Sequence, residues 1–235
     1  MNFIANLFSS SLGRKFIMAV TGCALFLFVI GHLLGNLQVF LGPEAINAYG
    51  HFLQSKPGLV WTARLGLLAM VLLHVWSAVT LSAENRAARP IGYLGDPIPP
   101  AASYASRTML MSGLIIAAFI IYHLLHFTVQ VQTINLSGRD FRILQDLHGR
   151  HDLYRMMVIG FTHPLVSGMY IVAMALLFLH LSHGVSAMFQ SVGLKNLTFG
   201  PLVDRFAKVA AWVIFAGYIS IPVAILLGYG KEALK

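Results

Sequence analysis

Long apolar segments alternate with shorter polar ones along the whole of this chain. A bilayer core about 30 Å thick needs about 20 mostly apolar residues in a helix. Five segments are long enough, and none has a charged residue in its middle: 15–41, 58–83, 107–131, 156–184 and 207–229. The pattern predicts an all-α integral membrane bundle of five transmembrane helices. No flexible linker interrupts it, so we expect a single membrane domain over residues 1–235.

Prolines and polar stretches mark where these helices bend and end. Pro164 and Pro222 fall inside the fourth and fifth segments. Neighbouring helices can satisfy the carbonyls that a proline frees, so we expect kinks there and not breaks. The apolar signal of the fourth helix runs on to about Phe189. The expected connections are residues 42–58, 89–100, 132–155 (the longest) and 190–206.

The composition supports the membrane class and excludes several others. Hydrophobic residues make up 57% of the chain and charged residues only 10%, whereas soluble domains carry about 25% charged residues. The net charge of +8 comes from Lys and Arg scattered over short loops, which suits lipid headgroups better than nucleic acid. Lys and Arg divide equally between the two sides of the predicted bundle, so charge does not fix its orientation.

Cysteine use narrows the chemistry further. Cys23 is the only cysteine, which excludes an internal disulfide, a thiolate-bound iron–sulfur cluster and a Cys-rich zinc site. The string Val20-Thr21-Gly22-Cys23 resembles a lipoprotein processing site. In such a signal the apolar core precedes the cysteine, whereas here the apolar run continues to Phe40. We therefore interpret the segment as a membrane span.

Histidines are concentrated in the apolar segments. Seven of the ten lie in them or at their ends: His32, His74, His123, His126, His163, His180 and His183. Ionisable residues inside a membrane are costly and usually functional. Because consecutive helices run in opposite directions, His32 and His123 approach one membrane face, while His74 and His180 approach the other. The chain thus offers one histidine pair near each face.

Two imidazoles from facing helices are the axial ligands that a six-coordinate b-type haem requires, and helix bundles build such sites in their cores. Zinc would need further ligands. His126 and His183 share helix faces with His123 and His180, so either member of each couple can be the ligand. The other would then bond a propionate, a quinone or a carbonyl. His163 is a third candidate at the His32/His123 level or a quinone contact, whereas we expect the loop residues His51, His148 and His151 to be solvated.

Small residues near these histidines fit both a cofactor and plain helix packing. They are Gly31, Gly35, Ala78, Gly168 and Gly184. Small residues allow helices to approach closely and leave room for a flat macrocycle.

Several motifs, taken in order, resemble a known family. They include Ser9-Ser10-Ser11-Leu12-Gly13-Arg14-Lys15, Gly31-His32-Leu33-Leu34-Gly35-Asn36-Leu37, Asn47-Ala48-Tyr49-Gly50-His51-Phe52-Leu53, Leu73-His74-Val75-Trp76, Tyr122-His123-Leu124-Leu125-His126-Phe127, Tyr170 and His180-Leu181-Ser182-His183-Gly184. Together they cover nearly the whole chain. They resemble the single-chain, two-haem cytochrome b subunit of succinate:quinone oxidoreductase (succinate dehydrogenase/fumarate reductase), the membrane anchor of that respiratory complex.

The resemblance implies a role and a set of ligands. The haem ligands would be His32 with His123 in a distal haem b, and His74 with His180 in a proximal one. The N-terminus would be cytoplasmic in a bacterial inner membrane. Electrons would pass between an iron–sulfur subunit and membrane quinone, with menaquinone favoured by analogy. A flavoprotein subunit would hold the succinate site, so none is expected on this chain.

Cationic and hydroxyl side chains near the membrane edges are candidates to bind haem propionates or quinone. They are Ser11, Arg14, Lys15, Arg86 and Arg89 on the proximal side and Arg64 on the distal side. The loop over residues 135–153 looks longer than in compact members of the family.

Rival functions differ in what they require of the sequence. A two-haem cytochrome b of another dehydrogenase, such as a hydrogenase or formate dehydrogenase, would also use paired histidine ligands. Only the residues that make up the motifs disfavour it. A transporter or proton channel with a histidine relay predicts paired carboxylates or broken helices near mid-membrane, which the sequence does not indicate. A structural anchor without haem would not need two level-matched histidine pairs.

Overall fold

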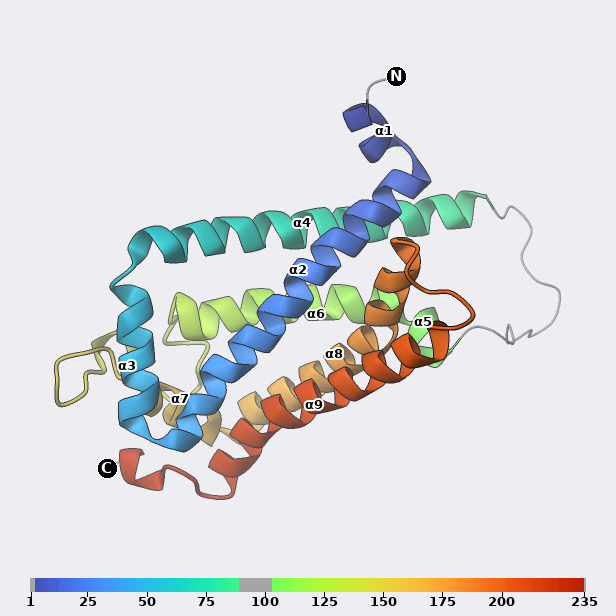
Figure 1. Ribbon diagram of the computed structural model, residues 1–235. Coiled ribbons are helices and arrows are strands. Elements are labelled where there is room, and N and C mark those ends of the chain that lie inside the picture. Colours follow the sequence, from blue (N-terminus) through green and yellow to red (C-terminus); the bar gives the residue numbers. More distant parts are fainter. Residues whose placement is uncertain (1–2, 89–102, 235) are drawn as a thin grey trace.

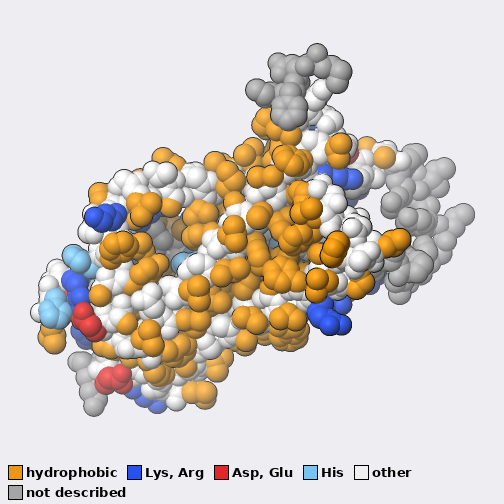
Figure 2. All heavy atoms as spheres, viewed as in Figure 1, with side chains coloured by type: hydrophobic (Ala, Val, Ile, Leu, Met, Phe, Trp, Pro, Cys, Tyr) orange, Lys and Arg blue, Asp and Glu red, His pale blue; other side chains and the backbone are white. Residues whose placement is uncertain are grey.

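The computed structural model describes residues 3–88 and 103–234, and within these the chain is an all-α bundle without a strand (Figure 1). Its long helices are α2 (Ser11–Leu37), α4 (Pro57–Ala87), α6 (Met109–His123), α8 (Pro164–Ser191) and α9 (Gly200–Leu226). A 3-10 turn, η1 (Gln38–Leu41), extends α2, and a π-helical turn, η2 (Leu124–Thr128), extends α6. These five units are long and apolar enough to cross a membrane. Figure 2 agrees, because hydrophobic side chains cover the flank of the bundle between its charged ends.

Short elements gather at the two ends of the bundle (Figure 1). The N side carries α1 (Phe3–Ser9) and α5 (Tyr104–Arg107), with the end of α4 and the start of α9. The C side carries α3 (Pro43–Gln54), η3 (Phe141–Ile143), α7 (Leu153–Thr162) and η4 (Lys231–Leu234). Between them α8 packs along α9 and also contacts α2 and α6, while α2 packs on α4.

Local sequence explains where several helices begin. Ser10 caps α2, since its side chain accepts a hydrogen bond from the backbone N–H of Gly13 at 3.0 Å. Proline stands in the first turn of α3, α4, α8 and α9, where its missing N–H has no helical partner to lose. Gly13 is required by close contact, because a Cβ there would lie 2.3 Å from the carbonyl oxygen of Leu7. The turn between α1 and α2 therefore depends on this glycine.

The fourth predicted helix is broken, so the expectation of a kink at Pro164 is wrong. Residues 156–162 belong to α7, His163 is extended (φ −80°, ψ 119°), and α8 begins at Pro164. A residue before proline is pushed out of the helical region, which explains the extended His163. The Ser167 hydroxyl donates to the Phe161 carbonyl at 2.7 Å and satisfies a group that the break would leave unpaired. Pro222, by contrast, remains inside α9, as predicted.

Other boundaries also differ from those predicted. The first and second spans are longer than expected, since α2 begins at Ser11 and α4 ends at Ala87. The fifth begins at Gly200, within the predicted connection. The first connection holds the amphipathic helix α3 and is not simply a polar loop. The predicted turns over 89–100 lie outside the described residues.

Two buried clusters hold the bundle together. On the C side, Val39, Tyr154, Val158, Val166 and Ile221 belong to a core that joins α7 and η1 to α8 and α9. Nearer the N side, α2, α8 and α9 share a second core that includes Phe26, Leu33 and Ala211. The second core packs α8, which carries His180, against α2, which carries His32.

Candidate functional site

The structure brings the four principal histidines together in two pairs. His32 of α2 faces His123 of α6, with ring centroids 5.8 Å apart and ring planes at 80°. His74 of α4 faces His180 of α8, with centroids 6.3 Å apart and planes at 65°. These are the partners that depth along the helices predicted. The first pair lies toward the C side and the second toward the N side, so we call them the C-side and N-side pairs.

The spacing within each pair fits a metal ion held between two imidazoles. A metal–imidazole nitrogen distance of about 2.0–2.1 Å on each side puts the two ring centres about 6.3 Å apart. The N-side pair, at 6.3 Å, has this separation, and the C-side pair, at 5.8 Å, is slightly closer. Each facing pair therefore has the span that axial ligation requires.

Two ligands per site suit a cofactor that brings its own equatorial donors. Among the described residues, no group of three or more His, Cys, Asp or Glu side chains could hold a metal ion. Structural zinc sites use four protein ligands and catalytic ones three. A haem needs only axial residues from the protein, so the residues present fit haem.

Hydrogen bonding orients the ring of His74 and fixes which nitrogen carries its proton. Its Nδ1 lies 3.2 Å from the carbonyl oxygen of Met18 and 3.2 Å from the Thr21 hydroxyl oxygen. Thr21 in turn donates to the Ile17 carbonyl at 2.7 Å. The His74 Nδ1–H thus donates to Met18, which leaves a lone pair on Nε2. Such a partner commonly orients a metal-binding imidazole.

The opposite ring, His180, has a buried Nδ1 that makes no hydrogen bond within the described part of the chain. Its orientation therefore rests on packing. Gly113 of α6 lies against it, since a Cβ there would be 3.3 Å from His180 Cε1. Gly22 of α2 lies against His74 in the same way, at 3.2 Å from its Cε1. The sequence analysis missed both glycines, because the helix rotations that bring them to the rings cannot be read from spacing.

The glycines selected from the sequence have different surroundings. A Cβ at Gly31 or Gly168 would meet no atom within 4 Å, so there is open space beside these helices. Gly35 instead packs against Tyr49, with 2.9 Å from a built Cβ to the ring. Gly184 lies near Met109 and His180. Gly31 thus lies at an exposed surface of α2, whereas Gly35 serves helix packing.

Two histidines on α6 and its extension meet one tyrosine of α8. Nδ1 of His123 lies 3.3 Å from the Tyr170 hydroxyl, and Nδ1 of His126 lies 2.9 Å from it. His126 is completely buried in the π-helical turn η2. Single π turns often occur at functional sites. Tyr170 appeared in the sequence only as part of a motif, and its contact with both rings was not predicted.

The remaining intramembrane histidines do not join either pair as a third close ring. His163 caps the start of α8, and its buried Nδ1 has no hydrogen-bond partner in the described chain. His183 follows His180 by one turn and is partly buried. Both stay predictions as quinone or propionate contacts.

Glu84 engages two of the candidate propionate partners on the N side. Its carboxylate accepts from the Ser11 hydroxyl at 3.0 Å and forms an ion pair with Arg14. The sequence analysis did not single out Glu84. Arg14 Nε is buried and has no hydrogen-bond partner among the described residues. The Nε–H of Arg14 is therefore without a partner there, whereas Ser11 links α2 to α4.

The other cationic candidates among the described residues are at the surface. Lys15 and Arg86 are exposed. The guanidinium of Arg64 lies over Trp61, 5.2 Å from the ring centroid, an arrangement typical of a cation–π contact. Arg89 lies outside the described residues.

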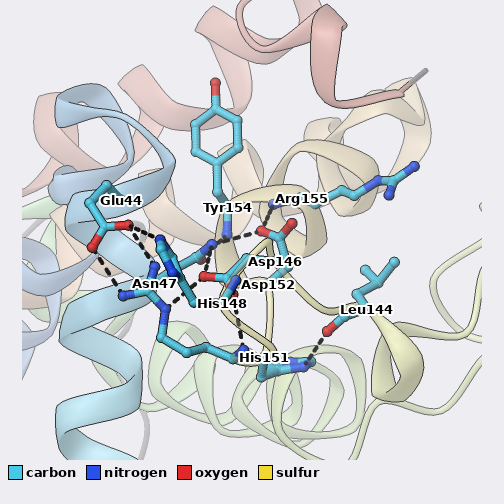
Figure 3. A network of polar contacts seen from close by, with 10 residues as sticks. Glu44, Asn47, Leu144, Asp146, His148, His151, Asp152, Tyr154 and Arg155 are labelled. Carbon is cyan, nitrogen blue, oxygen red and sulfur yellow. Dashed lines mark hydrogen bonds and ion pairs between the residues drawn. The ribbon is translucent and has the colours of Figure 1, made fainter.

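A polar network joins α3 to the loop before α7 on the C side (Figure 3). Arg150 pairs with Glu44 of α3 at 2.6 Å and with Asp146 at 2.7 Å. The buried Asn47 accepts from the backbone N–H of Tyr154 at 3.0 Å and donates to Asp152 at 3.1 Å. These bonds fasten the loop before α7 onto α3.

The groups of this network stabilise one another in their charged forms. The hydrogen bond from Arg150 lowers the pKa of Glu44 below its usual value. Hydrogen bonds to Glu44 and Asp146 raise the pKa of Arg150. The long 132–155 connection is thus a docked cap with a short helical turn, η3, and not an unstructured loop.

The loop histidines are not all solvated, so that expectation is partly wrong. His51 and His148 are exposed, and His148 Nε2 lies 3.7 Å from the Glu44 carboxylate. His151 is partly buried, because its Nδ1 contacts the Leu144 carbonyl at 3.2 Å and its Nε2 contacts Gln130 at 3.0 Å.

The features expected of a transporter are only partly present. A helix break does occur at His163, but it lies at the start of the span that begins at Pro164, and not at its middle.

Comparisons with protein-family models, with curated proteins and with solved structures found no match for this chain. The geometry of the histidines therefore carries the argument about function.

Proposed function

We propose that this chain is the membrane-anchor cytochrome b subunit of a succinate:quinone oxidoreductase. It holds two haem b groups and passes electrons between an iron–sulfur subunit and membrane quinone. The observation that carries the proposal is the pairing of four intramembrane histidines at 5.8 and 6.3 Å, one pair toward each side of the bundle. The family itself is proposed on the motifs that the sequence shares with such subunits.

The protein's own residues hold and shield the cofactors. His32 with His123 and His74 with His180 would be the axial ligands. Haem supplies a reversible one-electron centre whose potential depends on its ligands, hydrogen bonds and burial. Helices α2, α4, α6 and α8 each supply one ligand, so the bundle fixes the distance between the two centres. On the N side, Arg14 would hydrogen-bond a propionate, although its ion pair with Glu84 offsets part of its charge and Glu84 also takes the Ser11 O–H.

The resemblance to the family favours an N side that faces the cytoplasm and the iron–sulfur subunit. Exposed cations there include Lys15, Arg86 and Arg205, which would suit an acidic partner or anionic lipid headgroups. The N-side pair is then the proximal site and the C-side pair the distal one. The membrane is a bacterial cytoplasmic membrane, and menaquinone is the acceptor favoured by analogy with two-haem members.

Purification of the native complex tests the proposal. A tag on this chain should recover a flavoprotein and an iron–sulfur protein, with haem b, and the preparation should reduce a water-soluble menaquinone analogue with succinate. Recovery of haem b with hydrogenase or formate dehydrogenase subunits would instead establish another cytochrome b. A preparation without haem would overturn electron transfer by this chain.

A further inference from the structure

Within the described part of the chain, the Tyr170 hydroxyl is the polar group that contacts both His123 and His126. It lies 3.3 Å from Nδ1 of the first and 2.9 Å from Nδ1 of the second. Tyr170 is 7% exposed, and its ring packs edge-on against Phe119 and Phe161. The phenol is therefore held in place by its neighbours, and its hydroxyl serves two imidazoles at once.

Hydrogen-bond chemistry couples the two rings. A phenol has one O–H to donate and can also accept, while a neutral imidazole has one donor and one acceptor nitrogen. The Tyr170 O–H can donate to only one of the two Nδ1 atoms, so the other Nδ1 must donate to Tyr170. In one arrangement His123 donates from Nδ1 and keeps a lone pair on Nε2. In the other, His126 donates and His123 carries its proton on Nε2.

Packing shows which histidine has room for a macrocycle. His126 is 0% exposed, and its ring centroid lies 4.0 Å from that of Phe127. A Cβ at Gly160 would lie 3.3 Å from His126 Nε2, so the backbone of α7 closes that nitrogen off. His123 is only partly buried and faces His32. A flat cofactor can reach His123 but not His126.

We infer that Tyr170 is a positioning residue that selects His123 as the C-side ligand. His123 donates its Nδ1–H to the Tyr170 oxygen, and Tyr170 donates its O–H to His126 Nδ1. Nε2 of His123 is then free to coordinate, while His126 serves as the acceptor that orients the phenol. This inference rests on the proposed function, because it assigns roles around one of the two proposed haems.

Three variants test the arrangement in the purified complex. Tyr170→Phe removes the acceptor of the His123 Nδ1–H. Such hydrogen bonds raise the basicity of a ligating imidazole, so their loss disfavours the ferric state. We expect two haems per chain, an upward shift in the midpoint potential of one haem only, and a changed low-spin ferric EPR signal from that haem. His126→Leu removes the acceptor of the phenol and should alter the same haem.

His126→Asn is the conservative rescue. The Asn carbonyl oxygen occupies the same position along the side chain as His Nδ1 and can accept the phenol O–H. This variant should keep both haems and a potential close to that of the unmodified protein. Tyr122→Phe is the matched control, because its hydroxyl contacts the Ile134 carbonyl at 3.3 Å while its ring lies beside His126 and Tyr170. It should move neither haem.

The outcomes separate this inference from the proposed function. If His126→Leu removes a haem while His123→Ala retains both, His126 is the ligand and the inference is wrong. If Tyr170→Phe leaves both potentials and both EPR signals unchanged, or Tyr122→Phe shifts them equally, Tyr170 has no positioning role. Absence of haem in the unmodified complex would instead overturn the proposed function.

Discussion

Substitution of Gly22 should disable the N-side pair and leave the C-side pair intact. A Cβ at Gly22 would lie 3.2 Å from His74 Cε1, closer than ordinary van der Waals contact. The ring is held through Nδ1 by its hydrogen bond to Met18. When Gly22 becomes Ala, the ring must shift by a few tenths of an ångström against this bond. Disturbing the groups that orient a metal ligand typically weakens binding about 10–100-fold. This corresponds to about 1.4–2.7 kcal/mol.

The same substitution also stabilises the helix, which opposes the weakening of haem binding. A control variant separates the two effects. Replacing Gly with Ala in a helix interior is favourable by about 0.8–1.0 kcal/mol. Gly66 of α4 is the matched position, since a Cβ there meets nothing within 4 Å. Gly66→Ala should therefore gain helix stability and keep both haems. The difference between the two variants isolates the contact with His74.

Haem retention during detergent washing, followed by reduced-minus-oxidised spectra, measures the effect. Gly22→Ala should lose haem from one site faster than Gly66→Ala does. Gly22→Val adds two methyl groups beyond the crowded Cβ and should leave about one haem per chain. Two firmly held haems in Gly22→Val would refute the reasoning, because the His74 ring would then tolerate displacement.

Three further predictions concern the break and the cap. Ser167→Ala should lower the free energy of unfolding by about 1–3 kcal/mol, and with it the melting temperature, because the buried Phe161 carbonyl loses its partner. Unchanged melting relative to Ser182→Ala, whose hydroxyl bonds within its own helix, would contradict this. Asn47→Ala should destabilise the C side by a similar amount and speed proteolysis of the 132–152 loop, whereas equal cleavage in Gln132→Ala would count against it. The Glu44 pKa is lowered by Arg150, so its contribution is present above 4.5 and is lost as the pH falls through the lowered pKa. Hydrogen exchange of this loop should therefore be slower than in Glu44→Gln at neutral pH, and the two should converge in acid. If the exchange rates of the two proteins differ by the same factor at every pH, the Glu44 carboxylate does not stabilise this loop through its charge.

The spans and the pairing of histidines could be predicted because both depend on position along a helix. A run of apolar residues fixes which segment crosses, and alternating direction fixes the depth of His32, His74, His123 and His180. The structure confirms the five helices and places these four rings in the expected pairs. Depth gave the levels of the pairs, but it did not decide between His123 and His126 or between His180 and His183, because the members of each couple lie one turn apart.

Contacts that depend on helix rotation or on the chain beyond the helix ends could not be predicted. Gly22 and Gly113 meet the histidine rings only because α2 and α6 turn those faces inward. Helix α3 was read as a loop because its amphipathic pattern is short and lies between prolines. Pro164 breaks the helix at His163, and the Ser167 hydroxyl gives the freed Phe161 carbonyl a local partner, which spacing does not reveal.

The most direct test of the central claim is a haem b count in single and double histidine variants. His32→Ala, His123→Ala, His74→Ala and His180→Ala should each lose one of two haems. A double variant within one pair should lose no more than either single variant, because both residues hold the same group. A double variant across pairs, such as His32→Ala with His180→Ala, should lose both. Equal loss for within-pair and across-pair doubles, or two haems retained in any single variant, would contradict the assignment of one haem to each pair.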